Sequence, residues 1–421
     1  MQFSQNPKLG IYISVPFCRS KCTYCNFASG VYPASDHRRY VDRLIEDLKA
    51  SKPWAGQMGV ELPRRVDSVY FGGGTPSLLE ADLFEKLFAE LRNEFDFEPD
   101  AEITVECAPG QISEPTLAAL ALVGVNRVSL GVQSFIDREA QVSGRLHSRA
   151  SVLETIARLR AAGITNISVD LIAGLAGQTA SSWEESLDVL TGLNVPHASV
   201  YMLEVDEDSR LGRELLGGGA RYYAEAVPPD DAIASMYGVA VQRLTEGGLN
   251  QYEISNFSRP GFESRHNLRY WQRRPYLGLG LDASSALLSQ EEAPAGSPSQ
   301  PALARDLDPS PPYVLRTTTT DDLKEYLTGP QPVETAWLSP DRQHEEAWFL
   351  GLRMNAGVDL PAVEAEFGAE RVMRVRKAVS KMTADGLLIK EGETVRLTER
   401  GRLLSNDVFQ EFLEDVGQEV R

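Results

Sequence analysis

Short apolar runs alternate with amphipathic segments along the first half of the chain. Six of these runs read as β-strands: Ile11–Val15, Ser68–Phe71, Glu102–Glu106, Arg127–Val132, Ile167–Ile172 and Ala198–Leu203. Between them, apolar residues recur at helical spacing near residues 36–50, 78–94, 114–122, 149–162 and 181–191. Strands that are apolar almost throughout and alternate with helices predict a parallel sheet covered by helices. Six such units in succession favour an open (βα)6 partial barrel over a Rossmann sheet.

Residues 335–421 follow a different pattern. Helical patterns near 341–354, 360–366 and 369–385 precede two short apolar runs that a turn at Glu391-Gly392-Glu393 could join. Three helices and a hairpin predict a winged-helix-like α+β domain. Acidic stretches disfavour DNA binding by this domain, and a lid or docking role fits better. We therefore expect three parts, 1–230, 231–334 and 335–421, with a disordered Pro-, Ser- and Ala-rich insertion at 289–313.

The chain is acidic, with a formal net charge of −18 over 421 residues. Such a charge disfavours nucleic-acid binding, because it repels polyanions. No apolar run is long enough to cross a membrane, and residues 1–10 lack the features of a signal peptide, so we expect a cytoplasmic protein. Four cysteines, three of them clustered, do not suggest a disulfide framework.

The clustered cysteines directly follow the first predicted strand. Cys18, Cys22 and Cys25 have the spacing C-x3-C-x2-C. Thiolates bind zinc or iron–sulfur clusters, and a closed site of either kind takes four protein ligands. Three thiols without a nearby histidine favour a [4Fe–4S] cluster with one iron free for an exchangeable ligand. A zinc site completed by a distant residue and a group of unliganded buried cysteines are the alternatives.

Glycines and polar residues lie at the carboxyl ends of the next strands, where functional residues of such barrels gather. The turn Gly72-Gly73-Gly74-Thr75-Pro76 follows the second strand, Glu106 ends the third, Gln133 follows the fourth and Asp170 lies in the fifth. Glycines let the backbone approach a ligand closely. Glu106 and Gln133 suit an ammonium group and hydroxyls, and Arg145 suits a carboxylate. Each has an ordinary structural reading, but together they suit an amino acid that carries a ribose.

Several of these motifs, in this order, resemble one family. The cysteine motif with Tyr24 before its last thiol, followed by the GGGTP turn, resembles the radical S-adenosylmethionine (SAM) superfamily. Segments 104–106, 131–135, 144–147, 170–179, 252–257, 266–271 and 276–280 narrow the resemblance to the oxygen-independent coproporphyrinogen III oxidase group. This resemblance implies a [4Fe–4S] cluster on the three cysteines. It also implies SAM contacts from Tyr12, Tyr24, Gly73, Gly74, Thr75, Glu106, Gln133, Arg145 and Asp170.

Position 27 separates two classes within this group. The oxidases carry a further cysteine there, whereas this chain has Phe27, and only 17 residues precede Cys18. Both features resemble the HemW-type haem chaperones, which bind haem and pass it on. The resemblance therefore implies haem, a haem-accepting protein and an electron donor to the cluster as partners, and it leaves a homodimer open. An oxidase that decarboxylates porphyrinogen propionates is the alternative, and radical chemistry on another substrate is a third reading.

The chain departs from the family's pattern at three positions. Ser14, Ala176 and Asp206 stand where His, Pro and Glu are usual. The missing histidine puts in doubt any role it has beside the cluster, but the three thiols are intact. Cys107 is expected to be a buried structural thiol rather than a ligand or redox partner. His37, at the start of a polar helix, is expected to be solvated.

His266 is the predicted haem ligand. It lies in a His-Asn-x-x-Tyr-Trp motif, and the aromatic Tyr270 and Trp271 of the same motif could pack against a macrocycle. The alternative is that His266 only forms hydrogen bonds at a domain interface.

Overall fold

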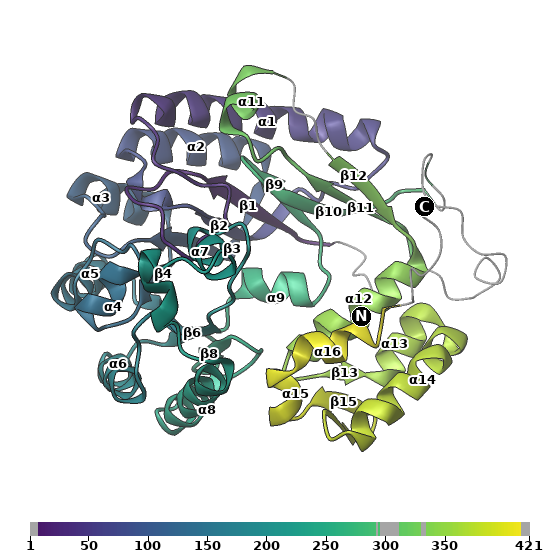
Figure 1. The fold of residues 1–421 in the computed structure, drawn as a ribbon. Helices are drawn as coiled ribbons and strands as arrows, with labels where there is room; N and C mark the ends of the chain where they lie inside the picture. Colours follow the sequence, from purple (N-terminus) through teal and green to yellow (C-terminus); the bar gives the residue numbers. More distant parts are fainter. Residues whose placement is uncertain (1–6, 292–293, 295–310, 330–333, 414–421) are drawn as a thin grey trace.

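A computed structural model describes residues 7–291, 294, 311–329 and 334–413 of the chain (Figure 1). Its centre is one twelve-stranded sheet in the order β12-β11-β10-β9-β1-β2-β3-β4-β5-β6-β8-β7. The six predicted strands are its parallel core: β1 (Leu9–Val15), β2 (Arg65–Gly73), β3 (Asp96–Cys107), β4 (Arg127–Gln133), β5 (Asn166–Ala173) and β6 (His197–Met202). The predicted (βα)6 partial barrel is confirmed.

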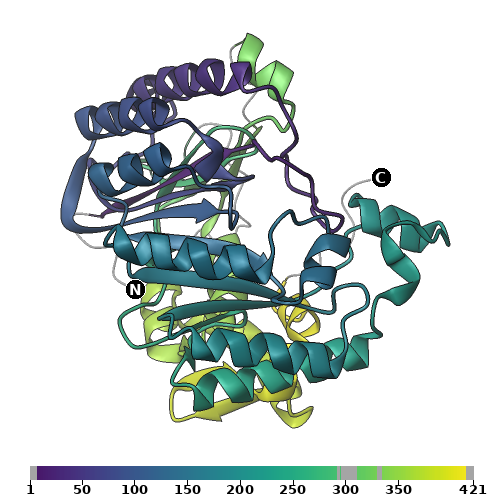
Figure 2. The same ribbon diagram turned by 90° about the vertical axis from the view of Figure 1, so that its left-hand side faces the viewer.

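Helices cover the outer face of this curved sheet (Figure 2). They are α1 (Ser35–Gln57), α2 (Ala81–Glu94), α3 (Glu114–Val123), α4 (Asp137–Val142), α5 (Arg149–Ala161), α6 (Ala180–Gly192) and α8 (Asp230–Glu246). Helix α1 is longer than its sequence pattern predicts and continues through Pro53. Ala55 is buried in the core and Trp54 packs against it, so tertiary contacts extend the helix past the proline.

Residues 231–334 add strands to both edges of the sheet. Beside β6 lie β8 (Asn256–Ser258) and β7 (Asn250–Gln251), which are antiparallel. Beside β1 lies the parallel strand β9 (Tyr276–Leu279), followed by the antiparallel strands β10 (Ser284–Leu288), β11 (Val314–Thr318) and β12 (Glu334–Leu338). Most of the insertion predicted at 289–313 lies outside the described residues.

Five further short helices lie before the C-terminal domain in the described ranges. Helix α7 (Arg210–Leu216) and the 3-10 helix η2 (Arg221–Ala226) follow β6. The 3-10 helix η1 (Pro76–Leu78) follows β2, and α11 (Leu323–Thr328) packs against α1. Helix α9 (Arg265–Trp271) contains the His-Asn-x-x-Tyr-Trp motif and lies between the sheet and the C-terminal domain (Figure 1).

The C-terminal domain has a hydrophobic core of its own, in which the rings of Trp348 and Phe412 stack 5.0 Å apart. The predicted helices and hairpin are all present: α12 (Pro340–Arg353), α13 (Leu360–Phe367), α14 (Ala369–Ala384), β14 (Leu388–Glu391) and β15 (Thr394–Leu397). A short strand, β13 (Val358–Asp359), makes the sheet three-stranded, and α15 (Glu399–Leu403) and α16 (Ser405–Gln410) end the described part. This is the winged-helix-like α+β arrangement that the sequence predicts.

Candidate cofactor site

A cavity of about 320 Å³ lies at the carboxyl ends of the barrel strands. The three cysteines line it, together with every predicted cofactor contact except Tyr12 and His266. The lining residues come from the cysteine loop, from the ends of β2 to β6 and, for Arg145, from the segment after α4. One face of the barrel therefore gathers residues that are far apart in sequence. This is the face at which barrels of this kind carry function.

Backbone hydrogen bonds hold the cysteine loop against the barrel. Cys18 N–H donates to Gly30 at 2.8 Å, and Thr23 N–H donates to Ser143 at 3.0 Å. The ammonium group of Lys21 donates to two carbonyls on the far side of the loop, those of Phe27 at 2.8 Å and Ser29 at 3.0 Å. The loop is therefore positioned by its backbone, and the three thiols need no contacts of their own to stay in place.

The three thiols of the loop are free and partly exposed, whereas Cys107 is buried. Burial raises the pKa of Cys18 above its ordinary value and raises the pKa of Cys107 to about 12. Cys107 is thus an inert thiol beside the cavity, as expected for a structural cysteine. Within the described ranges, no three His, Cys, Asp or Glu side chains are gathered closely enough to hold one metal ion. A cubane does not need such convergence, because its thiolate ligands bind separate iron atoms.

The glycine turn after β2 packs directly on the cysteine loop. Gly74 donates to Val15 at 2.8 Å, and a Cβ atom at Gly74 would lie 2.9 Å from backbone atoms of residues 15–17. Gly73 has φ +98°, which favours glycine. The hydroxyl of Thr75 lies 3.9 Å from the sulfur of Cys18. The absence of side chains at Gly73 and Gly74 therefore brings β2 against the thiols and leaves backbone exposed to the cavity.

Two carboxylates of the cavity, Glu106 and Asp170, have hydroxyl partners. Tyr70 donates to Glu106 at 2.8 Å, and Ser129 donates to Asp170 at 3.0 Å. Burial is the main cause that raises the pKa of Glu106 to about 7; the hydrogen bond from Tyr70 opposes this shift, and the neighbouring Asp170 adds to it. Burial also raises the pKa of Asp170. Both carboxyl groups are held where a hydroxyl or a cation would stabilise the charged form.

Gln133 and Arg145 carry buried polar atoms of the cavity that have no partner in the described chain. Gln133 has φ +68°, an uncommon value for a residue with a side chain, and its Oε1 atom is buried without a hydrogen-bond partner in the described chain. The Nε atom of Arg145 is also buried and unpartnered. Gly131 makes room for Arg145, because a Cβ atom there would lie 2.9 Å from the guanidinium. Strain and unmatched polar atoms at one place indicate a ligand site.

Tyr12 and His266 lie one layer deeper in the barrel. Their rings form a cluster with that of Tyr70: the centroids of Tyr12 and His266 lie 6.4 Å apart, and that of Tyr70 lies 6.2 Å from Tyr12 and 5.3 Å from His266. His266 is completely buried, and both ring nitrogens have partners: Ser68 at 3.0 Å and Tyr270 at 2.9 Å. Burial, with the charge of Arg269, keeps the pKa of His266 well below its usual value. Haem ligation by His266 stays a prediction and would require one of these hydrogen bonds to break.

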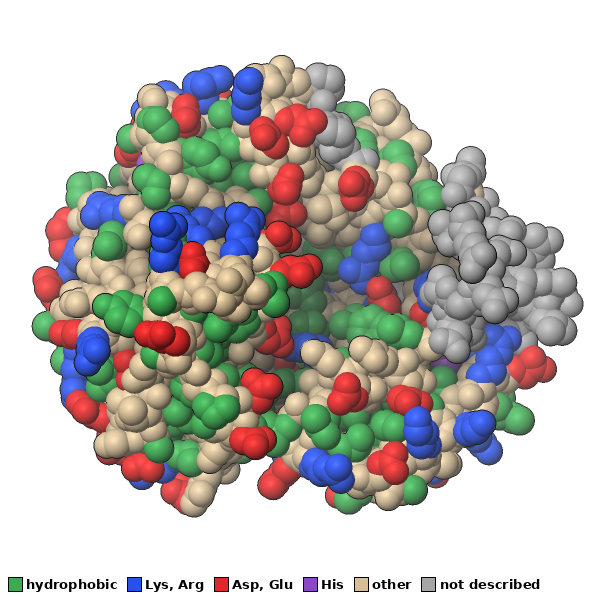
Figure 3. Space-filling model, in the orientation of Figure 1, with side chains coloured by type: hydrophobic (Ala, Val, Ile, Leu, Met, Phe, Trp, Pro, Cys, Tyr) green, Lys and Arg blue, Asp and Glu red, His purple; other side chains and the backbone are tan. Residues whose placement is uncertain are grey.

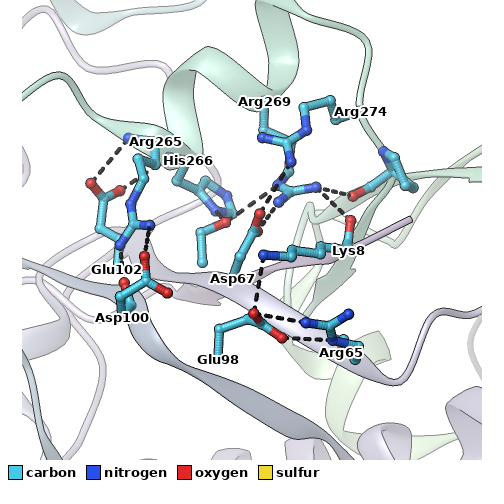
Figure 4. Close-up of polar contacts among 12 residues, drawn as sticks. Lys8, Arg65, Asp67, Glu98, Asp100, Glu102, Arg265, His266, Arg269 and Arg274 are labelled. Carbon is cyan, nitrogen blue, oxygen red and sulfur yellow. Dashed lines mark hydrogen bonds and ion pairs between the residues drawn. The ribbon is translucent and has the colours of Figure 1, made fainter. Parts of the chain in front are cut away.

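The amino ends of the strands below His266 are closed by a network of ion pairs (Figure 4). Its carboxylates all have partners: Asp67 with Arg269 and Arg274, Glu98 with Lys8 and Arg65, Asp100 with Arg265, and Glu102 with the backbone N–H groups of Arg265 and His266. Arg269 and Asp67 are nearly buried. The network fixes α9 across the end of the barrel opposite the cysteines.

Three further residues around the cavity were missed by the sequence reasoning: Tyr70, Ser129 and Tyr201. They belong to an inner face of the barrel that is polar at every second position. This face includes Ser68 and Tyr70 on β2, Thr104 and Glu106 on β3, Arg127 and Ser129 on β4, Ser168 and Asp170 on β5, and His197, Ser199 and Tyr201 on β6. The alternation of polar and apolar residues along each strand could have revealed this inner face in the sequence, because successive side chains of a strand point to opposite faces.

Comparisons with known proteins agree with this geometry. The model of the radical SAM superfamily matches residues 12–190, and that of the HemN C-terminal domain matches residues 338–404. The protein "Heme chaperone HemW" of Lactococcus lactis is 31% identical over 404 residues, which cover 96% of this chain and 97% of the relative. The protein of the same name from Mycobacterium tuberculosis is 32% identical over 406 residues, covering 96% of this chain and 94% of the relative.

The fold is shared with a solved structure. Coproporphyrinogen III oxidase (HemN) from Escherichia coli superposes with a TM-score of 0.77 at 22% identity, over 97% of this chain and 90% of that chain. The barrel, the three-thiol loop and the family match define a radical SAM protein. The chain belongs to the HemW haem chaperone family. No described helix is both long and apolar enough to cross a membrane.

The residues present fit the cofactors that this family implies. Three free thiols share the cavity with unpartnered polar atoms of Gln133 and Arg145 and with backbone exposed at the glycine turn. Such a set can offer thiolates to a cluster, and charged and amide groups to an amino acid with a ribose.

Proposed function

We propose that this protein is a haem chaperone that binds haem and transfers it to an acceptor protein, and that it carries a [4Fe–4S] cluster with SAM. The observation that carries the proposal is an open three-thiol cavity in a chain that matches proteins named haem chaperones along 96% of its length. Phe27 at the mouth of this cavity supports the chaperone class, because an oxidase would carry a cysteine there.

In this proposal the chain's own residues divide the work at the cavity. Cys18, Cys22 and Cys25 hold the cluster, and Arg145 pairs with the carboxylate of SAM. Glu106 accepts hydrogen bonds from polar groups of SAM, and Gln133 can accept or donate them. When bound, the cluster supplies one-electron reduction of SAM. An electron-donor protein serves as the source of that electron, and a haem-accepting protein takes the haem.

Haem titration of the reconstituted protein tests the proposal. The Soret band should shift and saturate at about one haem per chain. Mixing the loaded protein with a haem-free acceptor should then move the band to the acceptor's position. Absence of saturable binding would overturn the chaperone function.

Coproporphyrinogen III oxidation is the second candidate. The fold similarity to HemN and the HemN C-terminal domain favour it. It predicts protoporphyrinogen IX when the protein is incubated anaerobically with SAM, a reductant and coproporphyrinogen III. Restored growth of a strain that lacks the oxidase would establish this activity and displace the first proposal.

A further inference from the structure

A second cavity, of about 360 Å³, lies on the other side of the barrel core. Its walls are the end of α9, strands β9 to β11 and helix α12 of the C-terminal domain. In Figure 3 the molecule is hollowed between the sheet and the C-terminal domain, and Lys or Arg side chains are visible inside the hollow. The cavity shares no lining residue with the cysteine cavity.

Flat and apolar groups make up most of the wall. The aromatic members are Tyr270, Trp271, Tyr276 and Phe349, and the aliphatic ones are Ala286, Val314 and Leu350. The rings of Tyr270 and Tyr276 meet edge to face, 4.7 Å apart. Such a surface binds planar, largely apolar ligands well.

Positive charge concentrates at the same wall, although the whole chain is strongly negative. Arg316 contacts Glu346 at 2.9 Å, yet its Nε atom is buried with no hydrogen-bond partner in the described chain. The indole N–H of Trp271 is likewise buried and unpartnered. Arg274 is about two-fifths exposed and pairs with Asp67 at 3.2 Å, outside the cavity. The unused donors of Arg316 and Trp271, with the partly exposed guanidinium of Arg274 beside them, match carboxylate acceptors.

We propose that this second cavity binds a planar, mostly apolar dicarboxylate, with the carboxylates at Arg316 and Arg274 and the ring system against Trp271 and Tyr276. The identification of this ligand rests on the proposed function: it is haem, and its two propionates are the carboxylates. The haem site is then separate from the cofactor cavity, with the barrel core between them.

The His-Asn-x-x-Tyr-Trp motif acquires a definite role in this arrangement. Tyr270 and Trp271 face the second cavity, whereas His266 reaches it only through its 2.9 Å hydrogen bond to Tyr270. His266 therefore positions Tyr270 in the wall of the haem site. No His, Cys or Met is among the described residues that line this cavity, so any side-chain donor toward iron would be an oxygen of Tyr270, Tyr276, Gln343 or Glu346.

Haem titration of full-length variants tests the site. Arg316→Gln removes a carboxylate partner, and Val314→Glu adds a repelling charge at a partly exposed position of the wall. Each should weaken haem binding by roughly ten- to hundredfold. Arg342→Gln, which breaks an Arg–Glu pair elsewhere on α12, and Thr318→Glu, on the same face of β11 but outside the cavity, are the matched controls and should bind haem normally.

The dimethyl ester of iron protoporphyrin separates carboxylate recognition from apolar contact. The unmodified chain should prefer haem over the ester, and Arg316→Gln should lose most of that preference. Cluster absorbance and thermal unfolding confirm that each variant is folded. If both wall variants bind haem as the unmodified chain does, the second cavity is not the haem site, although the chaperone function stands. If the unmodified chain binds no haem, the proposed function itself fails.

Discussion

The two ends of the barrel differ in how completely their polar groups are satisfied. At the carboxyl end, Gln133 and Arg145 present buried atoms without partners, and Gln133 has a strained backbone. At the amino end, every carboxylate of the network around α9 has a partner (Figure 4). Both ends are rich in charge, so charge alone does not identify a site. Unmatched polar atoms that line a cavity do, because a buried polar group without a partner is costly unless a ligand supplies one.

The largest expected effect separates cofactor binding from folding at the open end. Cys22→Ser removes one of the three free thiols of the loop, so bound iron and sulfide should fall from about one cluster per chain to almost none. The fold should remain, because the loop is held by backbone hydrogen bonds. Iron and sulfide analysis after reconstitution measures the loss.

Cys107→Ser is the matched control for this substitution. Cys107 is buried beside the same cavity, and its thiol donates to the carbonyl of Val105 at 3.9 Å. The variant should keep its cluster. If both variants lost iron and sulfide equally, the result would not identify the loop cysteines, rather than Cys107, as the cluster ligands.

The next effect concerns the closed end, where a substitution should change the stability of the fold and not cofactor binding. Arg269→Met removes a buried guanidinium that pairs with Asp67 and donates to two carbonyls. The free energy of unfolding should fall by about 3–5 kcal/mol, because Asp67 loses its buried partner. Urea denaturation measures it.

An exposed ion pair provides the comparison for Arg269. Lys49 and Glu90 form a 3.2 Å pair at the surface, and Lys49→Ala should change stability by less than about 1 kcal/mol. If Arg269→Met cost no more than this control, the network of Figure 4 would not be what closes the barrel.

The strand–helix alternation could be read from the sequence because the outer face of each strand is apolar and each helix is long. The inner face was misjudged: strands described as apolar almost throughout carry polar residues at alternate positions, such as Ser129 and Arg127 on β4. The strands at the sheet edges are only two to five residues long, too short for a clear period. Their pairing is set by tertiary contacts.

Individual histidines show why burial was the hardest property to predict. His37 was expected to be solvated, and this is wrong: it is buried, its ring lies 4.2 Å from that of Phe17, and it contacts Glu80 at 3.1 Å. Glu80 is 43 residues away in sequence, so local polarity gave no sign of the contact. The thiols could be predicted because their spacing is local, whereas Glu80, the partner of His37, and Ser68, one of the two partners of His266, are distant in sequence.

The third effect is the pH dependence of stability that the buried carboxyl group of Glu106 causes at the open end. The pKa of Glu106 in the folded chain, about 7, is raised above its unfolded value of 4.5, so the folded state binds more protons between these values. Stability should therefore fall as pH rises through this window. Without cofactors, Glu106→Gln should stabilise the chain at pH 8 by about 1–3 kcal/mol and have little effect near pH 5. Urea denaturation across pH measures both.

Glu102 is the matching carboxylate of the closed end. It accepts from two backbone N–H groups of α9, each at 3.0 Å. Glu102→Gln should lower stability by about 1–2 kcal/mol, the opposite sign to Glu106→Gln at pH 8. Effects of the same sign would mean that the two ends do not differ in the way proposed.

The smallest effect is expected at position 27, the residue that separates the two classes. Phe27 is 60% exposed at the mouth of the cysteine cavity, and its backbone carbonyl, which accepts from Lys21, would survive substitution. Phe27→Cys should change stability by less than about 0.5 kcal/mol and leave the iron content unchanged, because three thiols already complete the ligand set. An anaerobic assay with coproporphyrinogen III should detect no protoporphyrinogen IX.

Phe27→Ser controls for the loss of the aromatic ring. If both variants lack oxidase activity, position 27 marks the class without carrying its chemistry, and the difference in function must come from elsewhere in the chain. The second cavity is then the place to look, because it is lined by residues that the cluster and SAM do not need. Oxidase activity in Phe27→Cys but not in Phe27→Ser would instead place the difference in a single thiol at the open end of the barrel.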